Sequence, residues 1–293
     1  ISTIHTGGAV QIASGFGTAH SSGALILRTA NGGTSGVSGI MTFASGTTSS
    51  GASGSVTLAS GSATGGKGGD IKLSVGTGTA DVGGHLIGSS GVSNAETGGH
   101  VSLSTGAGTA TSSGAVVVKT AGGGSNGVSG RMAFSTGAAT SGSSGKISFT
   151  TGSASAGRSG DISLAGGAAT GNTGGDIIFN AGSSTDQSGG FMSLTANKGT
   201  ATSSGAVVLG SADAGDAGTS GYLTFKSGTT SNGNSGQFSL TTGSATSGKG
   251  GQFIMSVGSG NTGAGGDISL TAGETTANTV VGGSVSVTGG AGT

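Results

Sequence analysis

The amino-acid sequence repeats itself with a period of fifteen residues. Residues 161–175 read DISLAGGAATGNTGG, and residues 176–190 follow as DIIFNAGSSTDQSGG. Nineteen copies of this phrase, the first opening at Ala9 and the last at Ser284, cover almost the whole chain of 293 residues. A fixed short period is typical of solenoid proteins, in which each repeat contacts only its neighbours. The period therefore predicts a rod of about nineteen stacked rungs.

The composition excludes an ordinary globular core. The chain contains 71 glycines, only 3% of its residues are aromatic, and it has no proline or tryptophan. Such small side chains cannot fill a thick core at normal packing density. A Gly/Ser-rich flexible chain and a bundle of polyproline-like helices are the alternatives. Apolar residues recur at fixed phases, and the absence of proline suits a hydrogen-bonded ladder, so we favour the solenoid.

Apolar side chains alternate near the start of each copy. When positions are counted from the first residue of a copy, positions two and four carry the large apolar residues, and position three is usually Ser, Thr or Lys. Alternation of this kind predicts a half-buried strand. We therefore expect an all-β fold, in which residues 1–293 form one continuous parallel β-solenoid. The expected core ladder comprises Ile71, Leu73, Ile147, Phe149, Ile162, Leu164, Ile177, Phe179, Ile268 and Leu270.

Two further positions have a constant chemistry. Position seven is almost always glycine, as at Gly61, Gly76, Gly152 and Gly243, and Asn197 replaces it once. We expect a corner there that needs positive φ or a close approach of the backbone. Position ten carries a hydroxyl or amide side chain. In a stack of rungs these side chains would form a hydroxyl ladder that includes Thr64, Thr79, Thr109, Thr140, Thr170, Thr185, Thr200 and Thr246.

A second, longer period of 91 residues is superimposed on the first. The copies opening at Ala24, Ala115 and Ala206 contain sixteen residues instead of fifteen. They divide the chain into the six-copy super-repeats 24–114, 115–205 and 206–293, after a partial repeat at 1–23. We expect the extra residue to form a strand bulge. A phenylalanine in the next copy would fill the widened core beside it, at Phe43, Phe134 and Phe225.

The last full copy and the two ends of the chain also depart from the pattern. The copy opening at Asp267 has seventeen residues, and we expect its extra pair to bulge outward near Val280 and Val281. The chain starts at Ile1 and stops within a copy, at Thr293. We expect that the chain either is a processed product or belongs to a longer polypeptide that continues beyond both ends.

The charge balance and the absence of cysteine restrict the partners. Ten basic and ten acidic residues leave a formal net charge of zero, and nucleic-acid binding requires a basic surface. The chain has no cysteine, so it has no disulfide framework. No apolar run reaches the length of about twenty residues that a membrane span needs. We therefore expect no nucleic acid, no membrane span and no cofactor.

Few residues are candidates for chemistry. His85 and His100 occupy equivalent positions in adjacent copies, where they would stack and could share a metal ion, but no third ligand is evident. Asp70, Asp161 and Asp176 follow a glycine, but the fifteen-residue period does not match a calcium-binding nonapeptide roll. We expect only a weak surface pair between Lys146 and Asp161. No nucleophile–base pair emerges, so the sequence predicts no enzyme, no catalytic site and no metal site.

The Gly-, Ser- and Thr-rich tandem copies along the whole chain resemble the repeat proteins of microbial and algal surfaces that form β-solenoid stalks or fibres. This resemblance implies an extracellular structural protein that lengthens a filament, sheath or appendage by end-to-end or lateral association with itself. The rank of position-ten hydroxyls is also similar to that of short-coil β-helical antifreeze proteins, which implies ice binding. A third alternative is the stalk of an adhesin.

Overall fold

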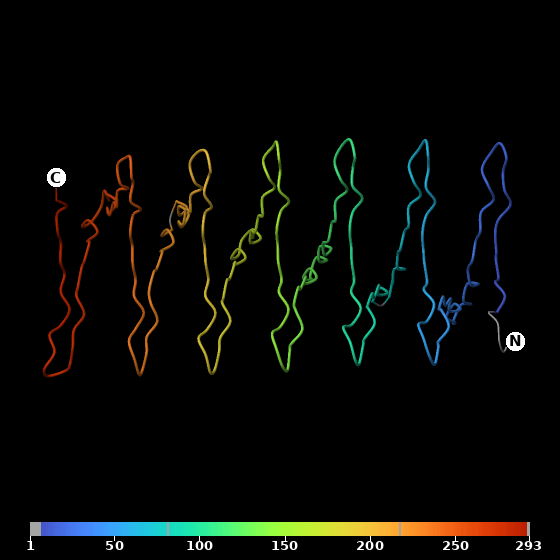
Figure 1. Ribbon diagram of the computed structural model, residues 1–293, viewed down its shortest axis with the longest axis horizontal. Helices are drawn as coiled ribbons and strands as arrows, with labels where there is room; N and C mark the ends of the chain where they lie inside the picture. Colours follow the sequence, from blue (N-terminus) through green and yellow to red (C-terminus); the bar gives the residue numbers. More distant parts are fainter. Residues whose placement is uncertain (1–6, 81, 217, 292–293) are drawn as a thin grey trace. The chain divides into compact units, whose positions relative to one another are not determined.

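The computed structural model describes residues 7–80, 82–216 and 218–291, and these residues contain no α-helix and no β-strand. Figure 1 accordingly shows long stretches of chain joined by tight bends, without arrows. The prediction of an all-β parallel β-solenoid is therefore wrong. The partial repeat at 1–23 is described only from residue 7.

The chain divides into two units, Ile1–Ile147 and Ser148–Thr293. The division falls inside the copy that opens at Lys146, within the second super-repeat, so the units do not coincide with the super-repeats. Both units are built from the same local elements, which are extended segments that alternate with loops.

The described chain buries none of its side chains. Its accessible surface is 28,550 Å², whereas a compact protein of this mass would expose about 11,000 Å². No described residue qualifies as a buried hydrophobic core residue. The predicted core ladder is therefore wrong, because no segment among the described residues covers the apolar positions.

The two apolar positions nevertheless differ consistently in exposure. In the ten predicted ladder residues, the position-two isoleucines are 47–56% exposed, and the leucines and phenylalanines at position four are 62–70% exposed. The alternation thus gives each extended segment a repeated apolar surface, and that surface faces solvent in every copy.

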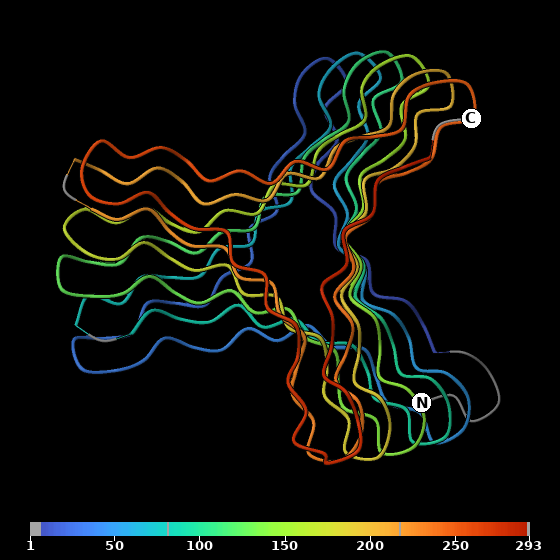
Figure 2. The same ribbon diagram turned by 90° about the vertical axis from the view of Figure 1, so that its left-hand side faces the viewer.

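Each copy ends in a loop whose base we call the neck. In several fifteen-residue copies the N–H of the last glycine donates a hydrogen bond to the carbonyl of position seven, as in Gly23 to Gly15 (3.1 Å) and Gly190 to Gly182 (2.8 Å). Figure 2 shows the chain running out to loop tips and returning. Asn197 makes the same contact, since its carbonyl accepts from the N–H of Gly205 at 3.0 Å. Position seven therefore contributes a carbonyl acceptor to the neck.

Position seven does not need the left-handed conformation, so the expectation of positive φ is wrong. In the described residues positive φ occurs only at glycines near the loop tips. Three of these glycines lie 91 residues apart, namely Gly51 (φ 101°), Gly142 (φ 97°) and Gly233 (φ 135°). A Cβ would meet no atom within 4 Å at Gly61, Gly76, Gly152 or Gly243.

The extra residue of the sixteen-residue copies lies in the loop and not in a strand, so the predicted strand bulge is wrong. In all three copies a hydrogen bond closes a four-residue turn, from Gly36 to Gly33, from Gly127 to Gly124 and from Gly218 to Gly215. These turns are 91 residues apart. In the seventeen-residue copy, the N–H of Gly283 donates a hydrogen bond to the carbonyl of Gly273 at 2.9 Å. The loop between these two glycines contains Val280 and Val281, near which the extra pair was expected.

Side chains stabilise some tips at the same interval of 91 residues. The hydroxyl oxygen of Ser93 accepts from the N–H of Glu96 at 2.9 Å, and that of Ser184 accepts from the N–H of Gln187 at 3.0 Å. Thr275 accepts from the N–H of Ala277 at 3.2 Å. Such local bonds are typical of Ser and Thr in turns. The 91-residue period is thus visible in local structure as well as in sequence.

We predict that Gly108→Ala opens one neck. A Cβ on Gly108 would lie 2.7 Å from the carbonyl oxygen of Thr111, and the equivalent Gly17 and Gly199 are equally crowded by backbone oxygens. The loop must shift, which breaks the 3.1 Å bond from the N–H of Gly114 to Gly106. Loss of one such bond, about 1 kcal/mol, should accelerate amide exchange at Gly114 roughly fivefold. Gly122→Ala is the control, since its Cβ would meet nothing within 4 Å. Equal exchange rates at Gly114 in the two variants would show that a side chain at position 108 does not open the neck.

Candidate functional site

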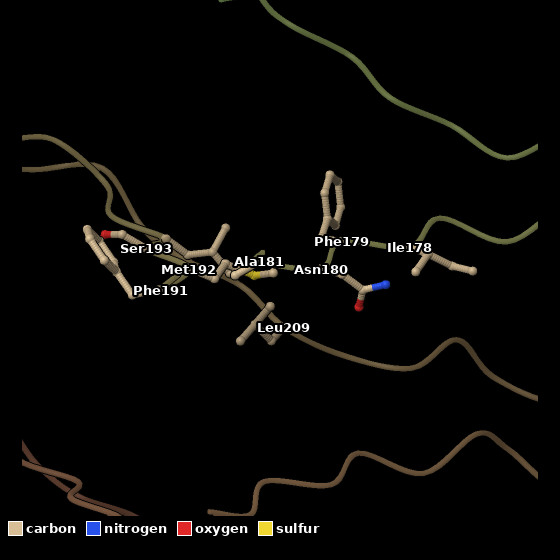
Figure 3. A pocket seen from close by; sticks show the side chains of 9 residues that line it. Ile178, Phe179, Asn180, Ala181, Phe191, Met192, Ser193 and Leu209 are labelled. Atoms are coloured by element: carbon tan, nitrogen blue, oxygen red, sulfur yellow. The ribbon is translucent and has the colours of Figure 1, made fainter. Parts of the chain in front are cut away.

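A concave, apolar surface lies within the second unit. It has a volume of about 660 Å³ and is lined by Ile178, Phe179, Asn180, Ala181, Phe191, Met192, Ser193, Leu194 and Leu209. Figure 3 shows these side chains, with Phe179 and Asn180 extending to opposite sides of the backbone. Phe191 is 90% exposed. The site is therefore an open apolar hollow and not an enclosed ligand cavity.

The hollow forms where two neighbouring copies carry unusually bulky residues. Position three is polar in most copies but is Ile178 in the copy opening at Asp176. Position one of the next copy is Phe191, where most copies carry a small or polar residue. Together with Phe179 and Met192, these residues widen the apolar surface beyond positions two and four. Sequence reasoning missed the hollow, although its signal was these two exceptions to the repeat.

A smaller depression of about 360 Å³ lies in the first unit, lined by Arg28, Thr29, Ala30 and Asn31. The hydroxyl of Thr29 donates a hydrogen bond to the carbonyl of Gly39 at 3.1 Å, which ties the two sides of this loop together. Its small polar lining offers a single cation and no second charged group.

Two ion pairs occur at equivalent places in successive super-repeats. Lys67 contacts Asp70 at 2.7 Å, and Arg158, 91 residues further on, contacts Asp161 at 2.8 Å. The predicted pairing of Asp161 with Lys146 is therefore wrong, because Asp161 pairs with Arg158, three residues before it in the chain. These side chains are 49–83% exposed, and exposed pairs contribute little to stability.

The metal-ligating residues do not gather into a site. No group of three or more His, Asp or Glu residues that could hold a metal ion occurs in the described chain. The expected stacking of His85 on His100 required hydrogen-bonded rungs, which the described residues do not form.

The eight threonines of the predicted hydroxyl ladder all lie at bends of the chain. None of these eight described hydroxyls makes a side-chain hydrogen bond to another of them. Because no rungs stack in the described residues, the threonines occupy separate loop tips and do not form a ladder.

The three phenylalanines assigned to widened core are exposed. Phe43, Phe134 and Phe225 are 58–70% exposed, so they fill no core. Phe225 instead contacts Phe238 of the next copy, with ring centroids 6.2 Å apart and an interplanar angle of 31°. This spacing lies in the favourable range for aromatic pairs.

These observations define a class of structure: a tandem-repeat chain whose described residues form no core, with exposed apolar segments and with loops that are closed at the neck in several copies. A scan against protein-family models and searches of curated proteins and solved structures found no match. Within the described ranges, no helix is long and apolar enough to cross a membrane.

Proposed function

We propose that this chain is a structural, non-catalytic repeat protein that forms or lengthens an extracellular filament, sheath or surface appendage by associating with further copies of itself. One observation carries the proposal. The large apolar side chains of positions two and four are exposed in copy after copy. Monomeric proteins rarely expose large apolar patches, and exposed apolar surface of that kind marks sites of association.

A second copy of the chain is the partner whose surface has the matching period. Apolar segments recur every fifteen residues, and the loop turns recur every 91 residues. Because a second copy repeats both intervals, it can cover many segments at once. Repeated contacts of this kind add avidity without any single strong contact.

The absence of packing in the described chain also favours a structural role over catalysis. Catalytic groups must be held within about 0.5 Å of a productive geometry by packed neighbours. None of the described polar or charged side chains is buried, so nothing in that part of the chain provides such support.

No observation favours the two other functions that the sequence suggested. Ice binders present ordered ranks of hydroxyls, whereas the eight threonines occupy separate bends. The stalk of an adhesin acts as a spacer and has no need of apolar side chains that are exposed in every copy.

Sedimentation velocity over a concentration series tests the proposal, together with electron microscopy and an apolar fluorescent dye. We expect growth into elongated particles as the concentration rises. We also expect dye fluorescence per mole of chain to fall as association covers the apolar segments. Monomers at every concentration up to about 1 mM, which corresponds to roughly 4 kcal/mol of association free energy, would exclude this function.

A further inference from the structure

The three super-repeats share their apolar pattern but differ in net charge. Super-repeat 24–114 has three cationic and three acidic residues and is neutral. Super-repeat 115–205 has five cationic and three acidic residues, a net charge of +2. Super-repeat 206–293 has two cationic and four acidic residues, a net charge of −2. The chain is therefore polar along its length although its total charge is zero.

Loop length restricts how two copies can align. The longer loops carry a backbone hydrogen bond from Gly36 to Gly33, from Gly127 to Gly124 and from Gly218 to Gly215, at intervals of 91 residues. A displacement of 91 residues or a multiple of it sets longer loops beside longer loops. Any smaller multiple of fifteen sets them beside shorter ones. Only displacements of zero, 91 and 182 residues therefore match both the apolar segments and the loops.

We infer, on the basis of the proposed function, that neighbouring copies associate in parallel with a displacement of 91 residues. At zero displacement, super-repeat 115–205 (+2) of one copy lies beside the same super-repeat of the next, and so does super-repeat 206–293 (−2). Both contacts are electrostatically repulsive. A displacement of 91 residues places the +2 super-repeat of one copy beside the −2 super-repeat of the next. A displacement of 182 residues overlaps only the neutral and −2 super-repeats. Complementary charge mainly selects the register, and the apolar segments provide the affinity.

A local charge pattern supports the same displacement. The ion pairs Lys67–Asp70 and Arg158–Asp161 occupy equivalent places in the first two super-repeats. The equivalent residues of the third super-repeat are Lys249 and Gln252, so Lys249 has no acidic residue at the equivalent place. In the displaced arrangement, Asp161 of the neighbouring copy is level with Gln252 and lies next to Lys249. The Asp161 side chain is 70% exposed, which leaves it accessible to a second cation. With zero displacement, Lys249 would face another Lys249.

The parallel direction follows from the requirement for a filament. An antiparallel pair could also place the +2 super-repeat of each copy beside the −2 super-repeat of the other. The charges of both copies would then be neutralised within a closed dimer. A displaced parallel contact leaves one super-repeat free at each end, so addition continues. Heterologous contacts of this kind generate open filaments.

Cross-linking between single-cysteine variants tests the register. The chain has no cysteine, and Ser112 and Ser203 are equivalent residues 91 positions apart. We would mix Ser112→Cys and Ser203→Cys chains in equal amounts, assemble them, oxidise them, and identify the linked peptides by mass spectrometry. We expect disulfides between positions 112 and 203 to exceed both symmetric products at least about tenfold, which corresponds to 1.4 kcal/mol.

The outcomes separate this inference from the proposed function. Filaments with mostly 112–112 and 203–203 disulfides would overturn the displacement and leave self-assembly standing. Mostly 203–203 disulfides would indicate an antiparallel dimer, and a statistical mixture would indicate no fixed register. Either result overturns the inference. Monomers without any disulfide would overturn self-assembly itself.

Charge reversal provides an independent test. Arg131→Glu with Lys146→Glu changes super-repeat 115–205 from +2 to −2, and should abolish the preference for 112–203 disulfides. Adding Asp213→Lys and Asp216→Lys changes super-repeat 206–293 from −2 to +2, and should restore it. The preference for 112–203 disulfides should also weaken at about 1 M salt, where the Debye screening length is roughly 3 Å. Retention of the preference in the first variant would overturn the electrostatic basis.

Discussion

Replacing four apolar side chains by serine should raise the concentration needed for assembly by about a thousandfold. The variant combines Ile162→Ser, Leu164→Ser, Ile268→Ser and Leu270→Ser, at positions two and four of two copies. These side chains are 50–68% exposed, and association would cover them. Covering the remaining surface contributes about 1 kcal/mol for each side chain, and about 4 kcal/mol corresponds to a thousandfold change in affinity. The critical concentration, measured by light scattering, checks the expectation.

The matched control is Ser163→Ala with Ser269→Ala. These residues occupy position three, between the apolar side chains of the same two copies. We expect less than a threefold change in critical concentration, since no apolar contact is removed. If the serine variant and this control assemble alike, the positions two and four do not form the contact surface.

Inserting one serine between Ile162 and Ser163 should raise the critical concentration about fivefold. Successive side chains of an extended segment point to opposite sides, so one extra residue moves Leu164 away from the side that carries Ile162. The loss of one matched apolar side chain corresponds to about 1 kcal/mol, or roughly fivefold. Sedimentation at a series of concentrations measures the change.

The control is the same serine inserted after Gly171, in the loop of the same copy. Gly171 has a positive φ of 78° and lies between Gly167 and Gly175, which are joined by a 2.9 Å neck bond. The sixteen- and seventeen-residue copies hold their extra residues in such loops, so we expect little effect on assembly. A fivefold increase in both variants would show that total copy length matters and that the side of the apolar segment does not.

Sequence reasoning located the two periods, and local structure follows them. The interval of 91 residues was read from the copies opening at Ala24, Ala115 and Ala206. It reappears in the turns at Gly33, Gly124 and Gly215. Glycine spacing and chain length act locally, so a single sequence is enough to locate such loops.

Sequence reasoning failed at the step from alternation to burial. Ile162 and Ile177 have the spacing of residues that would stack in a solenoid, yet both are about half exposed. Alternation shows which side chains lie on one side of an extended segment. It does not show whether the surface that covers them belongs to the same chain. The rungs of a solenoid need that cover from within, and the described residues do not supply it.

The apolar hollow was missed for a different reason. The repeat was defined by what its copies share, whereas Ile178 and Phe191 depart from the consensus at positions three and one. A site made of exceptions disappears when copies are averaged. Comparing each copy with the consensus would have marked both residues among its bulky apolar departures, which also include Ile26 and Ile254 at position three and Tyr222 at position one.

The open apolar segments also bear on the timing of fibre growth in the proposed role. A subunit whose contact surface is covered must first expose that surface before it can associate. In this chain the apolar side chains are already exposed to solvent. In the proposed role, no cleavage or conformational change therefore has to precede polymerisation. The rate at which new polypeptide is delivered then sets the pace of growth, and dilution is enough to hold the subunits apart.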